Sequence, residues 1–295
     1  MKLYRSSMFV PGHRAAWIAK AAGYGADCLI LDLEDSVPSQ EKIVARAVVR
    51  AGVKDLHARG QATQVRVNGF ASGLTLDDIE AVLCPELGEI TLPKVETVEH
   101  MQELDGLLTH LEKRAGIAVG ATETPLDLET AKGMRNLYEI VGSCPRVKRV
   151  TLNAGPGGDA ARAVGYVWSS EGTETLYLRS KTVLDCRAAG TLYPMISSWW
   201  NIKDLGGLEK DARHNRRLGF RGQTVMHPSH IPIVNKVFTP TADEIEFNKG
   251  LIRAMEAANE KGIAAVVYMG DMVDEAMART AREMIEFASA IGLEA

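Results

Sequence analysis

Short apolar runs alternate with stretches of helical spacing over the first 230 residues. Each run ends in polar residues, which is typical of the buried strands of a parallel sheet. The eight runs are Ser7–Val10, Ala26–Leu33, Gln64–Val67, Glu89–Leu92, Ile117–Ala121, Arg149–Leu152, Leu192–Ser197 and Gly222–Met226. Because eight strand–helix units close a parallel sheet on itself, the pattern predicts an α/β fold, a (β/α)8 TIM barrel, rather than an open sheet.

The stretches between these runs predict helices, and the pattern changes near residue 240. The expected helices of the barrel are Ala15–Ala22, Gln40–Leu56, Val98–Glu112, Glu174–Ala189 and Leu205–Leu218. The tail predicts two longer helices, Asp243–Lys261 and Val273–Ile291, separated by Gly262–Gly270. Thr241 and Glu244 form a capping box for the first of them. We therefore expect a barrel domain over residues 1–238 and a C-terminal helical extension over residues 239–295, which acts as a lid or a subunit contact.

Composition narrows the class of protein. The chain has 295 residues, 46% of them hydrophobic, which is enough for a large core, and a net charge of -4. The chain has no run of basic residues that would create a positive potential for a polyanion, so nucleic acid is not an expected partner. No signal core or long uncharged apolar stretch occurs, which predicts a soluble, cytoplasmic protein without a membrane segment. The four cysteines lack CxxC spacing and are interpreted as reduced structural thiols.

Three carboxylates follow the second apolar run at once. Asp32, Glu34 and Asp35 stand where a buried parallel strand leaves the core, which is where α/β enzymes carry their chemistry. The structural alternative is a strand end followed by a helix, with Ser36 as its cap and Pro38 in its first turn. Three acids at one strand end need cations or a metal, which favours a functional group.

Two cations stand at neighbouring strand ends. Arg66 alternates with Val65 and Val67, which turns it to the inner face of the barrel. A buried guanidinium requires an anionic partner, supplied either by the protein or by a substrate carboxylate. Lys94 shares a strand end with Glu96, and a nearby acid keeps a lysine charged. We interpret Lys94 as a charge-pairing or phosphate-contacting residue rather than a Schiff-base lysine.

Glu123 and Asp159 are candidate metal ligands. Each follows one of two neighbouring runs, the fifth and the sixth, and Mg²⁺ sites are commonly built from one or two such carboxylates with waters and substrate oxygens. Taken alone, each acid also fits a helix N-cap. The turn Pro156-Gly157-Gly158 before Asp159 has a second interpretation, a cradle of backbone amides for a phosphate.

His227 at the end of the last strand and the pair Trp199-Trp200 each have two interpretations. His227 is a candidate acid–base group, with packing or capping as the structural alternative. Trp199 and Trp200 form either an apolar wall of a pocket or part of the core. The sequence holds no Ser-His-Asp order, HExxH motif or paired-cysteine zinc site.

Several motifs resemble, in order, those of one enzyme family. They are RSxxFVPG from Arg5, LDLEDSV from Leu31, RVN from Arg66, LPKVE from Leu92, GFxGxxxMHP from Gly219 and GxMVD from Gly270. The set is similar to the citrate lyase beta subunit family of the HpcH/HpaI aldolase superfamily, which also holds malyl-CoA and citramalyl-CoA lyases. The resemblance runs from residue 5 into the tail.

The resemblance implies a barrel that binds Mg²⁺, or Mn²⁺ in its place, and cleaves or forms a carbon–carbon bond between an acyl-CoA and a 2-oxo acid. Glu123 and Asp159 would be the metal ligands, and Arg66 would stabilise the developing oxyanion or hold the substrate carboxylate. The relatives assemble as trimers or hexamers, which implies a homo-oligomer. Asp274 would reach the site of a neighbouring subunit and assist thioester hydrolysis.

The remaining residues of the motifs would bind substrate or orient other groups. The expected substrate-binding residues are Arg5, Arg66, Lys94, Pro156, Gly157 and His227. The acids expected to orient metal-bound waters and hold the arginines are Asp32, Glu34, Asp35 and Glu96.

Two departures from the family pattern concern the metal ligands. The family places Gly-Ala-Glu-Asp after strand six, whereas this chain has Gly157-Gly158-Asp159. Glu123 is followed by Thr124-Pro125 rather than by the commoner Thr-Ala-x-Gly. The first hypothesis is a lyase for malyl-CoA or citramalyl-CoA type thioesters. The alternatives are an aldolase for free hydroxy-oxo acids and a non-catalytic or partner-dependent subunit.

Overall fold

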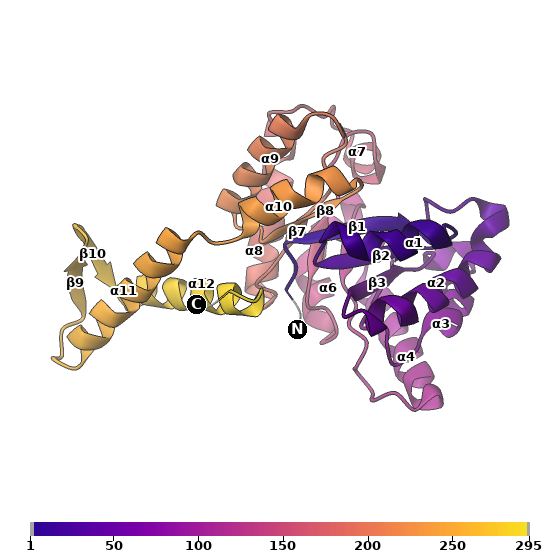
Figure 1. Cartoon of the computed structure of the whole chain (residues 1–295), viewed down its shortest axis with the longest axis horizontal. Coiled ribbons are helices and arrows are strands. Elements are labelled where there is room, and N and C mark those ends of the chain that lie inside the picture. Colours follow the sequence, from indigo (N-terminus) through magenta and orange to yellow (C-terminus); the bar gives the residue numbers. More distant parts are fainter. Residues whose placement is uncertain (1–2, 294–295) are drawn as a thin grey trace. The chain divides into compact units, whose positions relative to one another are not determined.

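The computed structural model describes residues 3–293, and the chain divides into two compact units (Figure 1). One unit runs from Tyr4 to Phe238, and the other comprises Leu3 and the chain from Thr239 onward. Within residues 3–293 no helix is both long enough and apolar enough to cross a bilayer.

The first unit is built on a parallel sheet of eight strands. They are β1 (Ser6–Pro11), β2 (Cys28–Asp32), β3 (Ala62–Arg66), β4 (Glu89–Thr91), β5 (Leu126–Leu128), β6 (Val150–Leu152), β7 (Met195–Ile196) and β8 (Gly222–Val225). Their order is β4-β3-β2-β1-β8-β7-β6-β5, and parallel bridges from Glu89 to Glu123 and from Leu92 to Leu126 join the two edges. The predicted (β/α)8 barrel is confirmed.

Helices follow the strands and cover the barrel. They are α1 (Ala15–Ala21), α2 (Lys42–Ala58), α3 (Thr75–Val82), α4 (Val98–Ala115), α5 (Ala131–Arg135), α6 (Leu137–Ser143), α7 (Asp159–Val164), α8 (Leu176–Ala188), α9 (Leu205–Leu218) and α10 (Ile231–Phe238). The prediction for α9 is confirmed at both ends. Asp204 accepts the amide of Gly207 at the start of this helix, and Gly219 follows its last turn with φ of 114°.

The prediction of the fifth strand is wrong. Residues 117–121 form a turn in which Val119 is 53% exposed, whereas the strand is Leu126–Leu128. The turn is held by Glu112, which accepts the amides of Gly120 and Thr122. An apolar run this short does not by itself distinguish a strand from a turn that packs one side on the core. The fifth strand therefore begins later in the chain than predicted, and the residues expected just after it, such as Glu123, precede it.

The second unit is a helical extension that also contains a hairpin. It holds α11 (Ala242–Asn259), β9 (Ala265–Tyr268), β10 (Asp271–Asp274) and α12 (Glu275–Ala290). The capping box of Thr241 and Glu244 is present. The antiparallel hairpin replaces the predicted connection and the first two residues of the predicted second helix. A small core of its own, with Leu251, Met255 and Val273, packs this unit.

Candidate active site

A cavity of about 760 Å³ opens at the carboxyl ends of the barrel strands. Residues from most of these ends line it: Pro11, Asp32, Asp35, Arg66, Glu129, Asn153, Asp159, Ser198 and His227. Trp17, Lys20 and Tyr24, on and just after α1, also line it. A cavity lined by apolar and aromatic side chains with a few polar groups is typical of a substrate site.

Arg66 and Asp32 form a buried ion pair at the mouth of the barrel. They are opposite one another in the register of β2 and β3, and the Arg66 Nε and Nη2 atoms each donate to Asp32 at 2.8 Å. Burial raises the pKa of Asp32, but the charge and hydrogen bonds of Arg66 outweigh it and hold the pKa at about 2. The Arg66 guanidinium also lies 4.9 Å from the centre of the Phe9 ring. The anionic partner that the sequence requires for Arg66 is thus supplied by the protein, on the inner face as expected.

Glu34 links this pair to Lys94. Its Oε2 atom lies 3.3 Å from Arg66 Nη1, and its Oε1 atom accepts from Lys94 Nζ at 2.5 Å. Burial raises the pKa of Glu34, against the opposing effect of Arg66. Asp35 is more exposed and lies 3.8 Å from Lys94 Nζ. The three acids at the end of β2 therefore pair with the two cations, as the sequence indicates.

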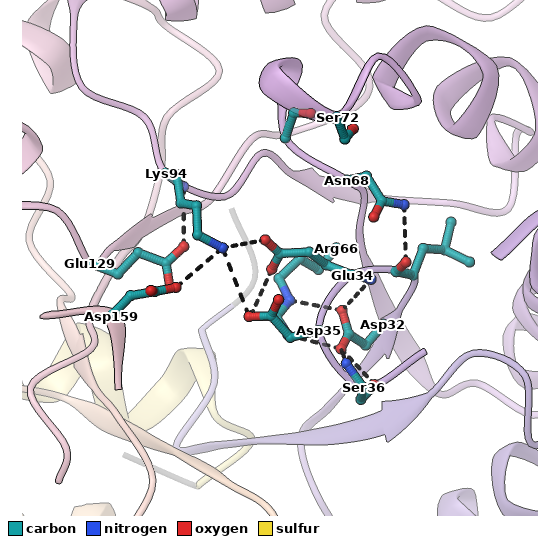
Figure 2. Close-up of polar contacts among 12 residues, drawn as sticks. Asp32, Glu34, Asp35, Ser36, Arg66, Asn68, Ser72, Lys94, Glu129 and Asp159 are labelled. Atoms are coloured by element: carbon teal, nitrogen blue, oxygen red, sulfur yellow. Dashed lines mark hydrogen bonds and ion pairs between the residues drawn. The ribbon is translucent and has the colours of Figure 1, made fainter. Parts of the chain in front are cut away.

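Lys94 connects three strand ends (Figure 2). Besides Glu34, its Nζ atom lies 3.2 Å from Asp159 Oδ2, and its backbone N–H donates to Glu129 Oε1 at 3.1 Å. Burial lowers the pKa of Lys94, but the hydrogen bond and charge of Glu34 outweigh it and raise the pKa above its ordinary value. Lys94 is therefore a charged group, which agrees with the interpretation as a charge-pairing lysine.

Glu129 is a site residue that the sequence reasoning missed. It follows β5 directly, is only 5% exposed and lines the cavity. Burial, with the charges of Asp127 and Glu34, raises its pKa to about 8. The signal was present in the sequence, because Glu129-Thr130-Ala131-Lys132-Gly133 carries the Thr-Ala-x-Gly pattern that is absent after Glu123.

The glycine of that pattern has a structural reason. A Cβ atom at Gly133 would lie 2.4 Å from the carbonyl oxygen of Val95, so only glycine fits there. Thr130 accepts the amide of Gly133 and caps α5. The pattern thus fixes the turn that follows Glu129 and presents its carboxylate at the strand end.

Glu123 lies at the other end of the barrel. It forms a parallel bridge with Glu89, the first residue of β4, and its backbone N–H donates to Gly88. Because β4 and β5 run in parallel, Glu123 precedes β5 at the amino end while Glu129 follows it at the carboxyl end. The expectation that Glu123 and Asp159 share one edge of the barrel is wrong, and it follows from the misplaced fifth strand.

Arg5 and Glu96 also differ from expectation. Arg5 precedes β1, and its guanidinium donates to both oxygens of Asp27, which places it at the amino end rather than on the substrate. Glu96 contacts other residues than Lys94. Its backbone N–H donates to His100 Nδ1, and its Oε2 atom is 3.9 Å from Lys132 Nζ. Glu34, not Glu96, pairs with Lys94.

The loop after β6 carries Asp159 and holds Trp200. Asp159 is the first residue of α7, its side chain makes no capping bond, and Arg162 donates to it at 2.9 Å. A Cβ atom at Gly155 would lie 2.6 Å from the Trp200 Nε1 atom, so the glycine admits the indole. Gly158 lines the large cavity, whereas Pro156 lines a small one beside it. Trp200 lines both cavities, which is the predicted role in the wall of a pocket. Trp199 is buried in the core, which is the predicted alternative.

The last two predicted residues have local roles in the structure. His227 lines the cavity, and its Nδ1 atom accepts the amide of Ser229 at the start of a short 3-10 helix. Asp274 belongs to the second unit, where it accepts the amides of Ala276 and Met277 and caps α12. Its proposed action on a neighbouring subunit stays a prediction.

Glu129 and Asp159 have the chemistry of a magnesium site. Both carboxylates lie at neighbouring strand ends, line the same cavity and contact the same lysine. Within residues 3–293 no group of three or more His, Cys, Asp or Glu side chains is arranged to hold a metal. Mg²⁺ does not need one, because it is usually held by one or two carboxylates and keeps several waters or substrate oxygens.

Comparisons with known proteins agree with these features. The model of the HpcH/HpaI aldolase/citrate lyase family matches residues 5–228. The citrate lyase subunit beta of Leuconostoc mesenteroides subsp. cremoris is 33% identical over 98% of this chain and 94% of its own length. The mitochondrial citramalyl-CoA lyase of Homo sapiens is 30% identical, covering 97% and 86%. The crystal structure of protein CitE from Mycobacterium tuberculosis in complex with magnesium, acetoacetate and coenzyme A is 26% identical, with a TM-score of 0.72 and 98% of each chain covered.

Proposed function

This chain belongs to the HpcH/HpaI aldolase/citrate lyase family of carbon–carbon lyases, and we propose that it is a Mg²⁺-dependent lyase for a 3-hydroxyacyl-CoA thioester. The reaction cleaves, or in reverse forms, the bond between an acyl-CoA and a 2-oxo acid, as with malyl-CoA or citramalyl-CoA. Mn²⁺ is a second ion that the same oxygen ligands would accept.

One observation supports the proposal above all others. Glu129 and Asp159 lie at neighbouring strand ends on the wall of one cavity, with Arg66 on the same wall. We assign the metal to Glu129 and Asp159, in place of the pair Glu123 and Asp159. A bound Mg²⁺ would polarise the carbonyl and carboxylate oxygens of a 2-oxo acid and favour the enolate.

The protein's own residues would orient the substrate around that ion. Arg66 is held rigidly by Asp32 and Glu34, so its guanidinium presents a fixed positive charge to the cavity. Such a preorganised charge stabilises a carboxylate or a developing oxyanion without reorganisation. His227 lines the same cavity and is the candidate group for moving a proton.

The size and lining of the cavity support a thioester rather than a small free acid. Besides the acids at the strand ends, Trp17, Tyr24 and Lys20 line this cavity of about 760 Å³. Aromatic side chains together with a cation suit the long pantetheine arm and the phosphates of coenzyme A. The relatives named for CoA thioesters and the neighbour solved with coenzyme A support the same substrate class.

The test is a lyase assay on the purified chain. We expect keto-acid release from at least one 3-hydroxyacyl-CoA of the malyl or citramalyl type with Mg²⁺, and loss of release with EDTA. Glu129→Gln should lower the activity about 10²- to 10³-fold, while Glu123→Gln serves as the matched control at the opposite end of the barrel. Failure to turn over any thioester with Mg²⁺ contradicts the proposal. Pyruvate release from free hydroxy-oxo acids without CoA would favour a free-acid aldolase.

A second candidate is a beta subunit that works only within a citrate lyase complex. The identity of 33% over 98% of the chain to a citrate lyase subunit beta favours it. This subunit would bind Mg²⁺ but release no keto acid from a CoA thioester alone. Activity that appears only with added partner subunits and their acyl carrier distinguishes it.

The tail is part of the same proposal. We propose that the chain forms a homo-oligomer, a trimer or a hexamer, in which Asp274 of one copy acts on the thioester in another. Light scattering would give the molar mass of the assembly and so the number of copies in it. Mixing an Asp274→Asn variant with a Glu129→Gln variant should restore thioester hydrolysis only if Asp274 acts between copies.

A further inference from the structure

Lys94 offers two separate hydrogen-bond donors to one group of acids. Its Nζ atom donates to Glu34 at 2.5 Å and lies 3.2 Å from Asp159 Oδ2, and its backbone N–H donates to Glu129 at 3.1 Å. Glu34 and Glu129 follow β2 and β5, and Asp159 begins α7 after the loop that follows β6. Figure 2 shows the lysine standing between them. A single residue therefore ties together three strands of the barrel mouth.

The backbone of Lys94 is held in an unfavourable conformation. Its φ is 57°, in the left-handed region that favours glycine and that a lysine enters at a cost. Such a conformation persists only where the surroundings hold it, and it is concentrated at functional sites. Here the surroundings are the carboxylates themselves, because the amide and the ammonium of Lys94 both contact them.

The ammonium contacts an oxygen that a divalent cation would need. Asp159 Oδ2 lies near Lys94 Nζ, and Asp159 Oδ1 accepts from Arg162, whose side chain is 78% exposed. A surface pair of that kind is weak and readily released, whereas the Lys94 ammonium lies against the buried Glu34. A cation on Asp159 therefore has to share this carboxylate with a second positive charge.

We propose that Lys94 is a positioning residue that holds Glu34, Glu129 and Asp159 together and competes with the divalent cation for Asp159. The inference rests on the proposed function, and it assigns Lys94 to the metal site rather than to the substrate. Two consequences follow. Without metal, Lys94 keeps mutually repelling carboxylates at one place, and with metal its like charge weakens the binding of the ion.

The first test measures metal affinity and not activity. Titration of Mn²⁺, followed by calorimetry and by the electron paramagnetic resonance of the free ion, compares the wild type with Lys94→Met and Lys94→Arg. We expect Lys94→Met to bind Mn²⁺ about tenfold more tightly, because one positive charge next to the ion is gone. Lys94→Arg should stay within threefold of the wild type, a margin of about 0.7 kcal/mol.

Lys132→Met is the matched control. Lys132 is three residues after Glu129, on α5, and its Nζ atom lies 3.9 Å from Glu96 instead of the three carboxylates. The Lys132→Met substitution removes one positive charge that is close to Glu129 in the sequence but outside the group of carboxylates around Lys94. If Lys132→Met tightens Mn²⁺ binding as much as Lys94→Met does, the effect is one of net charge and the inference is wrong.

The second test measures stability in EDTA and does not depend on metal binding. We expect Lys94→Met to lower the melting temperature, and the double variant with Asp159→Asn to recover part of the loss, because fewer like charges remain. Lys94→Gln repeats the test with a polar side chain if the methionine variant does not fold.

The outcomes separate this inference from the proposed function. If no variant binds Mn²⁺, or if Glu129→Gln leaves Mn²⁺ binding intact, the proposed metal site is wrong, and the EDTA test alone decides whether Lys94 holds the carboxylates. If the metal binds and Lys94→Met binds it no more tightly than the wild type, competition by Lys94 is wrong. An unchanged melting temperature of Lys94→Met in EDTA overturns the positioning role.

Discussion

Each end of the barrel buries an arginine next to carboxylates. At the amino end, Arg149 donates to Glu89 and to Gln64 Oε1, and its guanidinium lies 4.6 Å from the centre of the Tyr4 ring. At the carboxyl end, Arg66 is paired with Asp32 and Glu34. Both guanidinium groups are buried and both pair with a buried acid, so burial and pairing do not distinguish them.

What differs is the surplus of acid and the access to solvent. Beyond the acids that pair with Arg66, the carboxyl end brings Asp35, Glu129 and Asp159 around Lys94 and opens onto the large cavity. None of the Arg149 cluster lines that cavity. A buried arginine alone therefore does not indicate a functional site, whereas an excess of carboxylates on a cavity wall does.

The largest expected effect separates the two glutamates that flank the fifth strand, Glu123 before it and Glu129 after it. Glu129→Gln should lower kcat/KM about 10²- to 10³-fold and abolish Mn²⁺ binding, because a carboxylate ligand becomes a neutral amide. Glu123→Gln should leave both unchanged, since Glu123 lies at the amino end. The measurements are keto-acid release and Mn²⁺ titration. Equal losses in the two variants would contradict the difference between the two ends.

Replacement by lysine should affect catalysis at Arg66 and stability at Arg149. Arg66→Lys keeps the charge but not the two-pronged bond to Asp32, so kcat/KM should fall about 100-fold. Arg149→Lys should instead lower the melting temperature and leave kcat/KM of the folded protein unchanged. Steady-state kinetics and thermal unfolding measure both. A kinetic defect in Arg149→Lys would show that the amino end also contributes to the site.

The stability of the Arg66 pair should depend on pH. The pKa of Asp32 is about 2 in the folded chain, below its ordinary value of 3.8. Its ionised form stabilises the fold above pH 3.8, and that contribution, about 2 kcal/mol, is lost as the pH falls towards 2. Asp32→Asn should remove this part of the acid dependence of the free energy of unfolding. Asp35→Asn, which replaces an exposed acid just after β2, is the control, and an identical acid dependence in wild type and Asp32→Asn would contradict the prediction.

The smallest effect is expected at Arg5. Its pair with Asp27 is partly exposed at the amino end, so Arg5→Met should cost less than about 1 kcal/mol of stability. Substrate affinity should not change, because Asp27 holds the guanidinium away from the cavity. A raised KM in this variant would restore Arg5 to the substrate site, where the sequence motif alone had placed it.

The interpretation of the sequence succeeded where signals were local. Helix α9 was predicted at both ends from the helical spacing of its apolar residues, and the structure adds the caps Asp204 and Gly219. The acids after β2 and the inward position of Arg66 followed from a strand end and from alternation. The hairpin of the tail was missed because its strands are short and only Val273 among their residues is buried, whereas Val267 and Met272 are exposed.

The fifth strand shows the limit most clearly. Its pattern is Leu126-Asp127-Leu128, in which a fully buried acid interrupts the apolar run, whereas Ile117–Ala121 is apolar throughout but forms a turn. The pattern Thr130-Ala131-Lys132-Gly133 marked the correct strand end independently of hydrophobicity. Weighting that motif above the apolar run would have identified Glu129.

The sequence by itself determined that this chain forms a parallel barrel of the HpcH/HpaI type and that its acids and cations gather at strand ends. Those properties depend on alternation, helical spacing and short motifs, which are local. Only the tertiary structure decided that Asp32 holds Arg66 and that Lys94 joins three carboxylates. These contacts depend on the register between distant strands, such as Leu92 with Leu126, and no local pattern encodes that register.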